Sequence, residues 1–393
     1  MPSLYDRLGV PKLINAAGTL TRLGGSLMDA EVVAAMAEAS RSFVRMDQLH
    51  AAAGERIAEL TGAAAGLVTT GAAASLTLSA AACLAGTDFA RMDRLPDTSD
   101  MPNEIVIPRS HRNGYDHALR AAGARLVEVG LAERTRDPQP WEIAAAVNDR
   151  TVAIAFSVGF SPLPLEEVVV VAREHGVPVI VDASAALPPR GNLRKFITAG
   201  ADLVAYSGGK AIRGPQASGI LCGRRDLVAS AALQMWDMDF LPELWNPPPA
   251  LVDPAIVKRG VPNHGLGRAM KVGKEEIAGL LVALERFVAG DDTADRTRLA
   301  AVTKQIAAGL GDLPGASVSL VEREELWPVV RLEFASTAPK CAIEVARALE
   351  SGSPPVYLAT GDAHMGRLGI DPFCVQPGEA EVVVERVRAA FDS

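Results

Sequence analysis

The stretch LVAYSGGK at residues 203–210 joins a short run of strand-forming residues to two glycines and a lysine. It predicts a strand over residues 203–206, and the ligands of α/β sheets gather outside the carboxyl ends of the strands. A lysine held among glycines at such an end is partly desolvated, which lowers its pKa and frees its amine for imine formation. Lys210 is therefore a candidate catalytic residue, with an ordinary surface-loop lysine as the alternative. A Walker phosphate loop is excluded, because Ala211 stands where it needs Ser or Thr.

Strand and helix patterns alternate through the region around this lysine, from about Gly66 to Gly223. Short β-branched runs are followed by amphipathic stretches of helix length, which is typical of an α/β sheet. The predicted strands are residues 66–69, 105–107, 125–129, 152–156, 177–181 and 203–206. The predicted helices are residues 72–85, 115–122, 140–147, 165–175 and 193–199.

A proline-rich stretch, WNPPP at residues 245–249, ends this block and favours extended chain. We therefore predict a large cofactor-binding domain over residues 49–250 and a smaller α+β domain over residues 251–393. Residues 1–48 are expected to pack on the small domain and on a dimer partner. Within the small domain the pattern predicts helices over residues 275–288 and 378–391 and strands over residues 317–320 and 329–334.

Composition limits the class of protein. The 393 residues are 49% hydrophobic and 22% charged, which is typical of a globular enzyme, and the net charge of −8 leaves no basic field for nucleic acid. The four cysteines are scattered, so no metal site is expected, and they favour buried thiols in a reducing cytoplasm. The N-terminus resembles no signal peptide. The most apolar stretch, residues 72–86, contains three hydroxyl side chains and predicts a buried helix rather than a membrane span.

A carboxylate ends the predicted strand in VIVDAS at residues 179–184. A bound pyridine ring accepts electrons only while its nitrogen stays protonated, and a buried aspartate maintains that proton by ion pairing. Asp182 fits this role, and Ser184 is a further cofactor-binding candidate. A helix cap is the alternative for an aspartate that ends a strand.

The segment TTGAAAS at residues 69–75 predicts a strand that turns through one glycine into a helix. Free amide groups and the positive end of the helix dipole suit a phosphate dianion. Gly71, Ala72 and Ala73 are therefore candidate phosphate ligands, and Ser207 would add a hydroxyl. A plain strand–helix turn is the alternative.

A histidine follows another strand, in RSHRN at residues 109–113. The imidazole of His111 would stack on one face of the cofactor ring, while Asp182 holds the ring nitrogen and Lys210 the aldehyde carbon. Ser110 or Asn113 would serve equally well as a hydrogen-bonding neighbour, and a solvent-facing loop histidine is the alternative.

Phosphate turn, histidine, aspartate and lysine follow in this order, with Asp182 placed 28 residues before Lys210. The arrangement resembles the fold type I (aspartate aminotransferase-like) enzymes, which use pyridoxal 5′-phosphate (PLP). The resemblance implies PLP held as an imine on Lys210. It also implies a large α/β/α domain with a mainly parallel sheet and a smaller α+β C-terminal domain.

Several blocks narrow the resemblance to the bacterial selenocysteine synthase (seryl-tRNA selenium transferase) family: LINAAGT at 13–19, SGGK at 207–210 with GPQA at 214–217, and LGRAMKVGKE at 266–275. QMWDMD at 234–239 is closer to the small-molecule branch, typified by D-glucosaminate-6-phosphate ammonia-lyase. Two departures stand out. The chain begins almost at the Asn15 block, without a separate tRNA-binding domain, and Gly208-Gly209 replaces Gly-Asp. A tRNA substrate is not expected.

The resemblance implies a lyase or dehydratase that acts on a small hydroxylated amino acid or amino-sugar acid, with Lys210 as the base at the α-carbon. Racemase, aldolase and aminotransferase chemistry stay open, and selenium transfer to seryl-tRNA is a lesser alternative. Arg268 is the first candidate for binding the substrate carboxylate, followed by Arg22 and Arg367, with a structural ion pair as the alternative for each. At least a homodimer is implied, in which Gln216, Arg213 or residues near Arg22 reach the partner's site.

Overall fold

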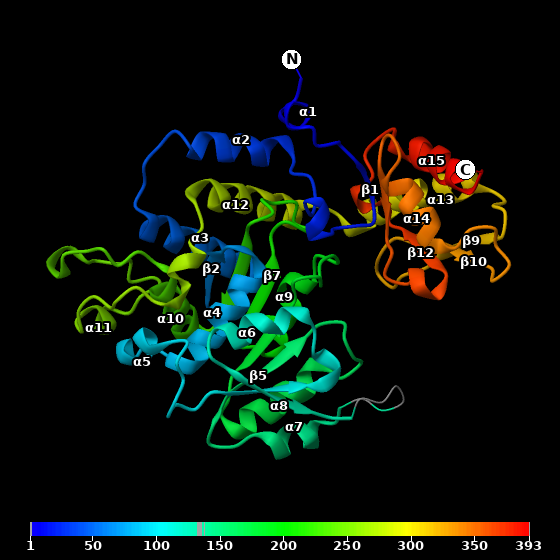
Figure 1. Cartoon of the computed structure of the whole chain (residues 1–393). Coiled ribbons are helices and arrows are strands. Elements are labelled where there is room, and N and C mark those ends of the chain that lie inside the picture. Colours follow the sequence, from blue (N-terminus) through cyan, green and yellow to red (C-terminus); the bar gives the residue numbers. More distant parts are fainter. Residues whose placement is uncertain (1, 132–135, 137, 393) are drawn as a thin grey trace. The chain divides into compact units, whose positions relative to one another are not determined.

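The computed structural model describes residues 2–131, 136 and 138–392 of the chain (Figure 1). It contains a small compact unit, formed by Met1–Leu27 and Gly290–Ser393, and a large one, formed by Met28–Ala289. This division differs from the boundary expected at residue 250. Helix α12 (Lys274–Ala289) follows the proline-rich stretch but packs against α2 (Ala30–Ala39) and α3 (Met46–Thr61). Because of this packing, α12 belongs to the large unit.

A seven-stranded sheet forms the centre of the large unit, in the order β2-β8-β7-β6-β5-β3-β4. The five strands from β7 to β4 are parallel, whereas β8 is antiparallel to both of its neighbours. This mainly parallel sheet confirms the predicted α/β class. The strands are β2 (Ala65–Thr69), β3 (Glu104–Pro108), β4 (Arg125–Val129), β5 (Thr151–Ser157), β6 (Val179–Asp182), β7 (Leu203–Ser207) and β8 (Gly219–Gly223).

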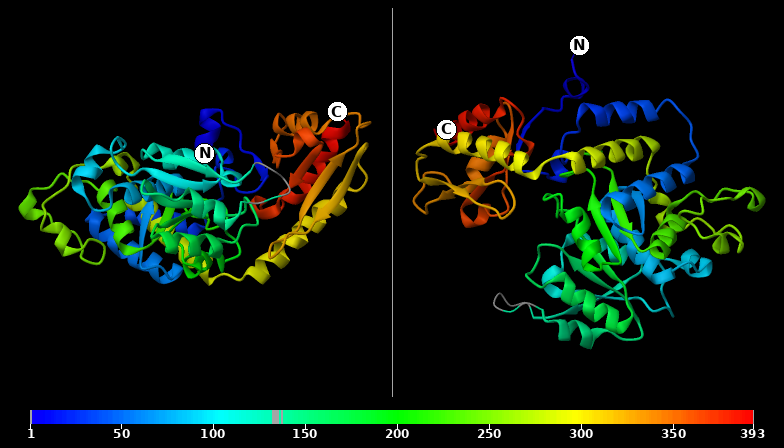
Figure 2. Two further views of the ribbon diagram at one scale, coloured as in Figure 1. Left: turned by 90° about the horizontal axis from the view of Figure 1, so that it is seen from below. Right: turned by 180° about the vertical axis from the view of Figure 1, so that it is seen from behind.

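Two groups of helices cover the sheet (Figure 2). The first group is α4 (Gly71–Ala85), α6 (His117–Ala121) and α10 (Arg225–Met235), in which α4 packs against both other helices and against five strands. The second group is α3, α7 (Pro140–Ala146), α8 (Leu165–His175) and α9 (Asn192–Ala199). Each group buries an apolar face of the sheet, which gives the layered architecture of an α/β domain.

Helix α4 is the helix that was predicted to be buried. Its residues from Ala74 to Ala82 are all buried, because alanine side chains let the helix backbone approach the sheet closely. The helix therefore lies at the centre of the main hydrophobic core. Its N-terminus points to the edge of the sheet where the chemistry was expected.

That edge is formed by the carboxyl ends of β2, β3, β5, β6 and β7. The last four strands are parallel, and β2 runs in the same direction as β7 because both are antiparallel to β8. All five strands therefore end on one side of the sheet. The candidate residues that follow them in the sequence meet there, as the rule for α/β sheets requires.

The small unit contains a three-stranded antiparallel sheet, β12-β10-β9, and a two-stranded parallel sheet of β1 and β11. Helices α13 (Asp292–Leu310), α14 (Ala342–Glu350) and α15 (Glu379–Asp392) contribute to its own core. The strands are β1 (Ile14–Ala16), β9 (Ala316–Val321), β10 (Val329–Phe334), β11 (Val356–Leu358) and β12 (Arg367–Ile370). Strand β1 shows that residues 1–27 belong to this unit, whereas α2, in the rest of the segment 1–48, packs against α12 of the large unit.

The six strands predicted before residue 210 are all present, within two residues at each end. Strand β8 and helices α10 and α13 were not among the predicted elements. None of the helices in the described part of the chain has the length and apolar character that a membrane crossing requires.

Candidate active site

The loop that carries Lys210 folds back on itself directly after β7. The Gly208 amide donates to the Ser218 carbonyl at 2.9 Å, and the Gly214 amide donates to the Gly208 carbonyl at 2.8 Å. A Cβ atom on Gly209 would lie 2.5 Å from the Cα of Gln216, so this loop has no room for a side chain there. This close approach of two backbone segments requires glycine at position 209.

The amine of Lys210 is electrostatically suited to react. Burial lowers the pKa of Lys210 below its ordinary value, and the negative charge of Asp182 partly offsets this effect. A lowered pKa increases the fraction of neutral amine near pH 7, and only the neutral amine attacks a carbonyl or removes a proton. The charge of Asp182 thus acts on the amine of Lys210.

Asp182 is the last residue of β6 and is half-buried. Its Oδ1 atom accepts a hydrogen bond from the backbone amide of Ser184 at 3.0 Å, which fixes the orientation of the carboxylate. Ser184 therefore contributes through its backbone, whereas its predicted contact with the cofactor stays a prediction. In the sheet ladder Asp182 lies between Ser157 of β5 and Ala205 of β7.

The turn before α4 leaves its first amide groups free of a capping side chain. Thr70 occupies the N-cap position but makes no side-chain cap bond, and its hydroxyl donates instead to the Met270 carbonyl at 3.0 Å. Gly71 has a φ of +82°, and a Cβ there would meet nothing within 4 Å. Open space beside uncapped amides at a 15-residue helix N-terminus suits a phosphate dianion.

The end of β7 lies beside this turn. Ser207 pairs with Gly219 in the β7–β8 ladder, and Thr69 pairs with the same glycine in the β2–β8 ladder. A Cβ on Gly219 would lie 2.4 Å from the carbonyl carbon of Gly71, so the backbones touch. Gly219 therefore lies between Ser207 and the phosphate turn, and the expected contact of the Ser207 hydroxyl with the phosphate stays a prediction.

His111 is completely buried in the turn that follows β3. Its ring meets the Phe156 ring edge-on, with centroids 4.7 Å apart and planes at 87°. Both ring nitrogens have partners: the Ser157 amide donates to Nδ1 at 3.2 Å, and Nε2 lies 2.8 Å from Ser161 Oγ. Burial lowers the pKa of His111 to about 4, so the imidazole is neutral at pH 7. Its stacking on a cofactor ring stays a prediction.

Arg268 lines a cavity of about 340 Å³ in the large unit. It lies in a short 3-10 helix, Leu266–Met270, whose last carbonyl accepts the Thr70 hydroxyl, so one wall of the cavity is bonded to the phosphate turn. The cavity is lined by aromatic and apolar side chains together with cations: Trp236, Phe240, Trp245, Met46, Met235, Val272, Arg45, Arg268 and Lys271, with Asp47, His50 and Asp237. Such a lining suits an anionic group on an organic molecule.

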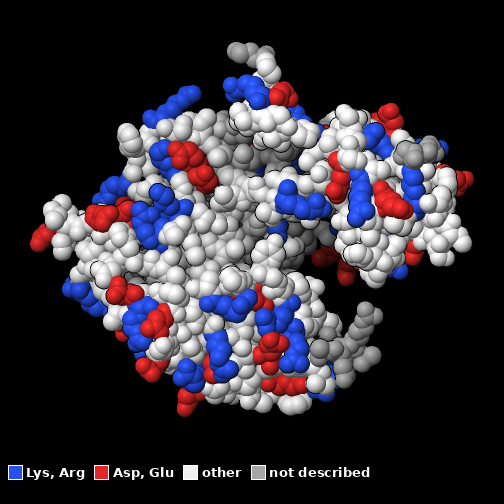
Figure 3. All heavy atoms as spheres, viewed as in Figure 1, with Lys and Arg blue, Asp and Glu red and all other residues white. Residues whose placement is uncertain are grey.

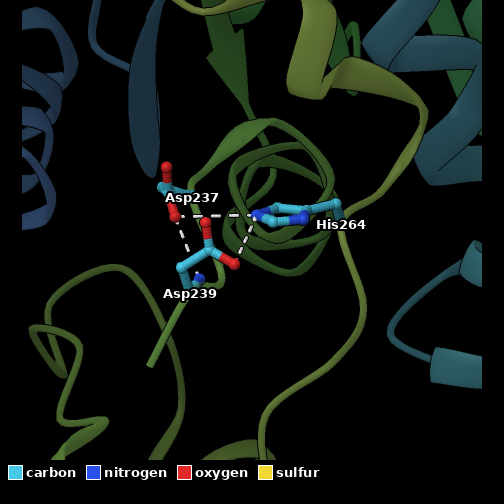
Figure 4. Close-up of side chains that lie close together, drawn as sticks. All are labelled: Asp237, Asp239 and His264. Atoms are coloured by element: carbon cyan, nitrogen blue, oxygen red, sulfur yellow. Dashed lines mark hydrogen bonds and ion pairs between the residues drawn. The ribbon is translucent and has the colours of Figure 1, made fainter. Parts of the chain in front are cut away.

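Asp237 holds the Arg268 guanidinium. Arg268 Nη2 donates to Asp237 Oδ2 at 2.8 Å, and His264 Nε2 lies 3.6 Å from Asp237 Oδ1. Figure 4 shows Asp237, Asp239 and His264 turned toward one another, and their ligand atoms all lie within 4.8 Å. All three are exposed, and Arg268 already uses one carboxylate oxygen, so we assign this cluster to orienting Arg268.

The other two candidate arginines belong to the small unit. The Arg22 guanidinium lies 5.6 Å from the centroid of the Tyr357 ring, and Arg367 pairs with Glu333 at 3.2 Å. Their role in substrate binding stays a prediction. The same holds for Arg213, which has a φ of +60°, and for the exposed Gln216, which were expected to reach a partner subunit.

The family follows from the match of the chain to a sequence model. Residues 13–235, more than half of the chain, match the family model of L-seryl-tRNA selenium transferase (SelA). The chain belongs to this family.

Two relatives are similar to this chain over almost its whole length. A 5′-C-glycyluridine monooxygenase-decarboxylase of a Streptomyces species is 36% identical over 98% of this chain and 90% of its own. The D-glucosaminate-6-phosphate ammonia lyase of Salmonella typhimurium is 32% identical over 98% of this chain and 97% of its own. The resemblance predicted from the sequence motifs is thus confirmed.

Solved structures agree with this assignment. A D-glucosaminate-6-phosphate ammonia-lyase superposes with a TM-score of 0.79 at 30% identity, covering 100% of this chain and 99% of that one. A serine palmitoyltransferase from S. paucimobilis, solved with bound PLP–myriocin, reaches a TM-score of 0.57 at 14% identity, covering 97% of this chain and 88% of that one. The second likeness shows the fold alone. This SelA-family protein is a PLP-dependent enzyme of fold type I.

The residues present fit PLP. A reactive amine on Lys210, a fixed carboxylate on Asp182 and an uncapped helix N-terminus at Gly71 match the aldehyde, the pyridine nitrogen and the phosphate of the cofactor. Ser157 and Ser161, the partners of His111, were not among the predicted site residues. Ser157 ends β5, so the strand-end rule that found Asp182 would also have found it, whereas Ser161 lies in a loop without a pattern.

The buried histidine of the cavity makes stability depend on pH. Burial lowers the pKa of His50 to about 4, and nearby Asp47 opposes this only weakly. In the unfolded chain this histidine has a pKa of about 6.5. The free energy of unfolding therefore falls as the pH drops from about 6.5 to 4, by at most about 3 kcal/mol for this group. Urea unfolding at pH 7 and pH 4.5 measures the loss. His50→Asn should lose less stability than the wild type over this interval, and an equal loss would contradict the assignment.

Proposed function

We propose that this protein is a PLP-dependent lyase that removes ammonia from a small hydroxylated amino acid or amino-sugar acid. The observation that carries the proposal is the half-buried Lys210 amine, whose pKa is lowered by burial and which interacts with Asp182 at the end of the sheet. An ammonia-lyase relative with 97% of its length aligned adds support. The products would be a 2-oxo acid and ammonia.

The residues divide the chemistry among them. When bound, PLP supplies an electron sink for a carbanion at the substrate α-carbon. Asp182 keeps the proton on the ring nitrogen by ion pairing, and the turn amides of Gly71, Ala72 and Ala73 hold the phosphate with Ser207. Lys210 Nζ removes the α-proton, and the lowered pKa keeps a fraction of this amine neutral. Loss of a β-hydroxyl followed by hydrolysis then releases the 2-oxo acid and ammonia.

The cavity beside the phosphate turn is the proposed site for the rest of the substrate. Arg268 is held by Asp237 and would bind a carboxylate through two parallel N–H donors, while the aromatic lining excludes water. Arg22 and Arg367 are retained as further candidates for binding the substrate.

Replacing Arg268 by glutamine should raise KM about 10-fold or more and change kcat less, because the interaction with the carboxylate exists before and during the reaction. Steady-state kinetics measures both constants on whichever substrate the ammonia assay identifies. Arg298→Gln, on exposed α13 of the small unit and paired with Asp295, is the matched control. An unchanged KM would transfer the role to Arg22 or Arg367.

A direct assay tests the proposed activity. The protein loaded with PLP is incubated with D-glucosaminate-6-phosphate, with the unphosphorylated acid and with a panel of β-hydroxy amino acids. Released ammonia, 2-oxo acid, aldehyde and the stereochemistry at the α-carbon are measured. Ammonia and 2-oxo acid in equal amounts support the lyase. Aldehyde alone would indicate an aldolase, inversion alone a racemase, and oxo acid without ammonia an aminotransferase.

A second candidate activity is oxidative decarboxylation. It is favoured by the 36% identity to a monooxygenase-decarboxylase over 98% of the chain. Uptake of oxygen and release of carbon dioxide, measured with 5′-C-glycyluridine, distinguish it from the lyase, which consumes no oxygen. Selenium transfer to seryl-tRNA has less support. The net charge is −8, and the face drawn in Figure 3 has acidic and basic side chains interspersed rather than one basic field.

We also propose a homodimer in the cytoplasm. Large apolar side chains are exposed in the N-terminal region, including Leu4, Tyr5, Leu8 and Phe43, and a partner subunit would bury them. Arg213, Gln216 or residues near Arg22 would then reach the partner's site. All four cysteines are free thiols, which suits a reducing compartment. A mass equal to that of one chain, measured by light scattering, would contradict the proposed dimer.

A further inference from the structure

The hydrogen bonds of His111 define its tautomer. The Ser157 backbone amide lies 3.2 Å from Nδ1, and an amide N–H can only donate. Nδ1 must therefore carry the lone pair, and the ring hydrogen of the neutral imidazole sits on Nε2. That hydrogen is donated to Ser161 Oγ, 2.8 Å away. The chain of donors thus runs in one direction, from Ser157 through His111 to Ser161.

Ser161 is itself held in place. It lies in the connection between β5 and α8, and its Oγ also accepts from the Leu163 amide at 3.4 Å. Phe156 meets the imidazole edge-on, which fixes the ring from a third direction. The torsion angle about the bond between Cβ and the imidazole ring can otherwise adopt a broad range of values. The contacts at the two ring nitrogens therefore determine the orientation of the ring plane.

We propose that Ser161 is a positioning residue of the cofactor site, which accepts the Nε2–H of the buried His111 and so holds the imidazole against the Ser157 amide, next to Asp182 in the sheet. This inference rests on the proposed placement of the cofactor beside Asp182 and Lys210. A neutral ring is the form that suits this place. A second positive charge would oppose the protonated pyridine nitrogen that Asp182 stabilises.

Substitution at residue 161 tests the proposal without any substrate. Histidine ¹⁵N NMR of the cofactor-free protein should show His111 as a single Nε2–H tautomer at pH 7. Ser161→Ala should keep this tautomer, because the Ser157 amide still donates to Nδ1, but it should shift the Nε2 and Nε2–H signals, because that hydrogen loses its acceptor. Ser161→Thr, which keeps the hydroxyl, should restore the wild-type signals. The six histidines of the chain make assignment practical, with His111→Asn identifying the signal.

Cofactor binding gives the second readout. Ser161→Ala should raise the Kd for PLP about 3- to 10-fold, the range expected for one lost hydrogen bond, and shift the absorption band of the bound cofactor. Ser161→Thr should stay within about 2-fold of the wild type. Ser319→Ala, on exposed β9 of the small unit, is the matched control and should change neither readout.

The outcomes separate this inference from the proposed activity. An Nδ1–H tautomer or an imidazolium in the wild-type protein at pH 7 would overturn it, even if the alanine variant does not fold. Unchanged Nε2 signals together with an unchanged Kd in Ser161→Ala would overturn it as well. A protein that binds PLP as expected but releases no ammonia from any substrate would remove the lyase proposal and leave the role of Ser161 intact.

Discussion

Lys210→Ala is expected to lower turnover by more than about 1,000-fold and to abolish the covalent attachment of PLP. The reason is that one amine performs two tasks, since Lys210 joins the cofactor aldehyde and then moves the α-proton. No other lysine shares its position on the loop after β7. Borohydride reduction followed by mass spectrometry should show the cofactor mass on the peptide with residue 210 in the wild type and none in the variant.

Two further variants make the Lys210 experiment specific. Lys195→Ala replaces an exposed lysine on α9 of the same unit and should leave attachment and turnover unchanged. Lys210→Arg keeps a positive charge near Asp182 but cannot form the imine, so it should be as inactive as the alanine variant. Cofactor found covalently bound elsewhere in Lys210→Ala would contradict the assignment of the site.

The placement of the candidate cofactor residues was predictable because it depends on local sequence. Lys210, Asp182, Gly71 and His111 each follow a strand that β-branched residues and flanking glycines mark, and parallel strands end on one side of a sheet. The order of the motifs then identified the family before any geometry was known. Local pattern and overall topology agree at these positions.

What was missed depends on contacts between distant parts of the chain. Ser161 lies 50 residues from His111, and nothing in the loop sequence marks it. The prolines at 247–249 suggested a domain boundary, but α12 returns to pack on α2 and α3. The antiparallel strand β8, GILCG, is short and ends in glycines, which obscured its pattern. Packing partners of this kind are set by tertiary structure, which periodicity does not encode.

Neither the sequence pattern nor the fold distinguishes among the three arginines that were predicted to bind the substrate carboxylate. All three candidates have partners in the structure: Asp237 for Arg268, the Tyr357 ring for Arg22 and Glu333 for Arg367. An ion pair at the surface contributes little to stability, so an arginine can leave its partner and bind a substrate carboxylate instead. Arg268 is favoured because it lines a cavity bonded to the phosphate turn.

Asp182→Asn is expected to retain PLP on Lys210 and yet lower kcat by about 100-fold or more. The amide is nearly the same size and still accepts the Ser184 hydrogen bond, so the site should keep its geometry. It carries no charge, however, so the proton on the pyridine nitrogen loses its ion pair and the ring becomes a poor electron sink. Loss of the carboxylate also removes the interaction that raises the pKa of Lys210, so in the cofactor-free protein this pKa should fall further. Asp182→Glu should recover part of the activity, because it restores the charge in an imperfect position. Stopped-flow absorbance separates attachment from turnover, and an asparagine variant with wild-type kcat would show that the ring nitrogen needs no counter-ion in this enzyme.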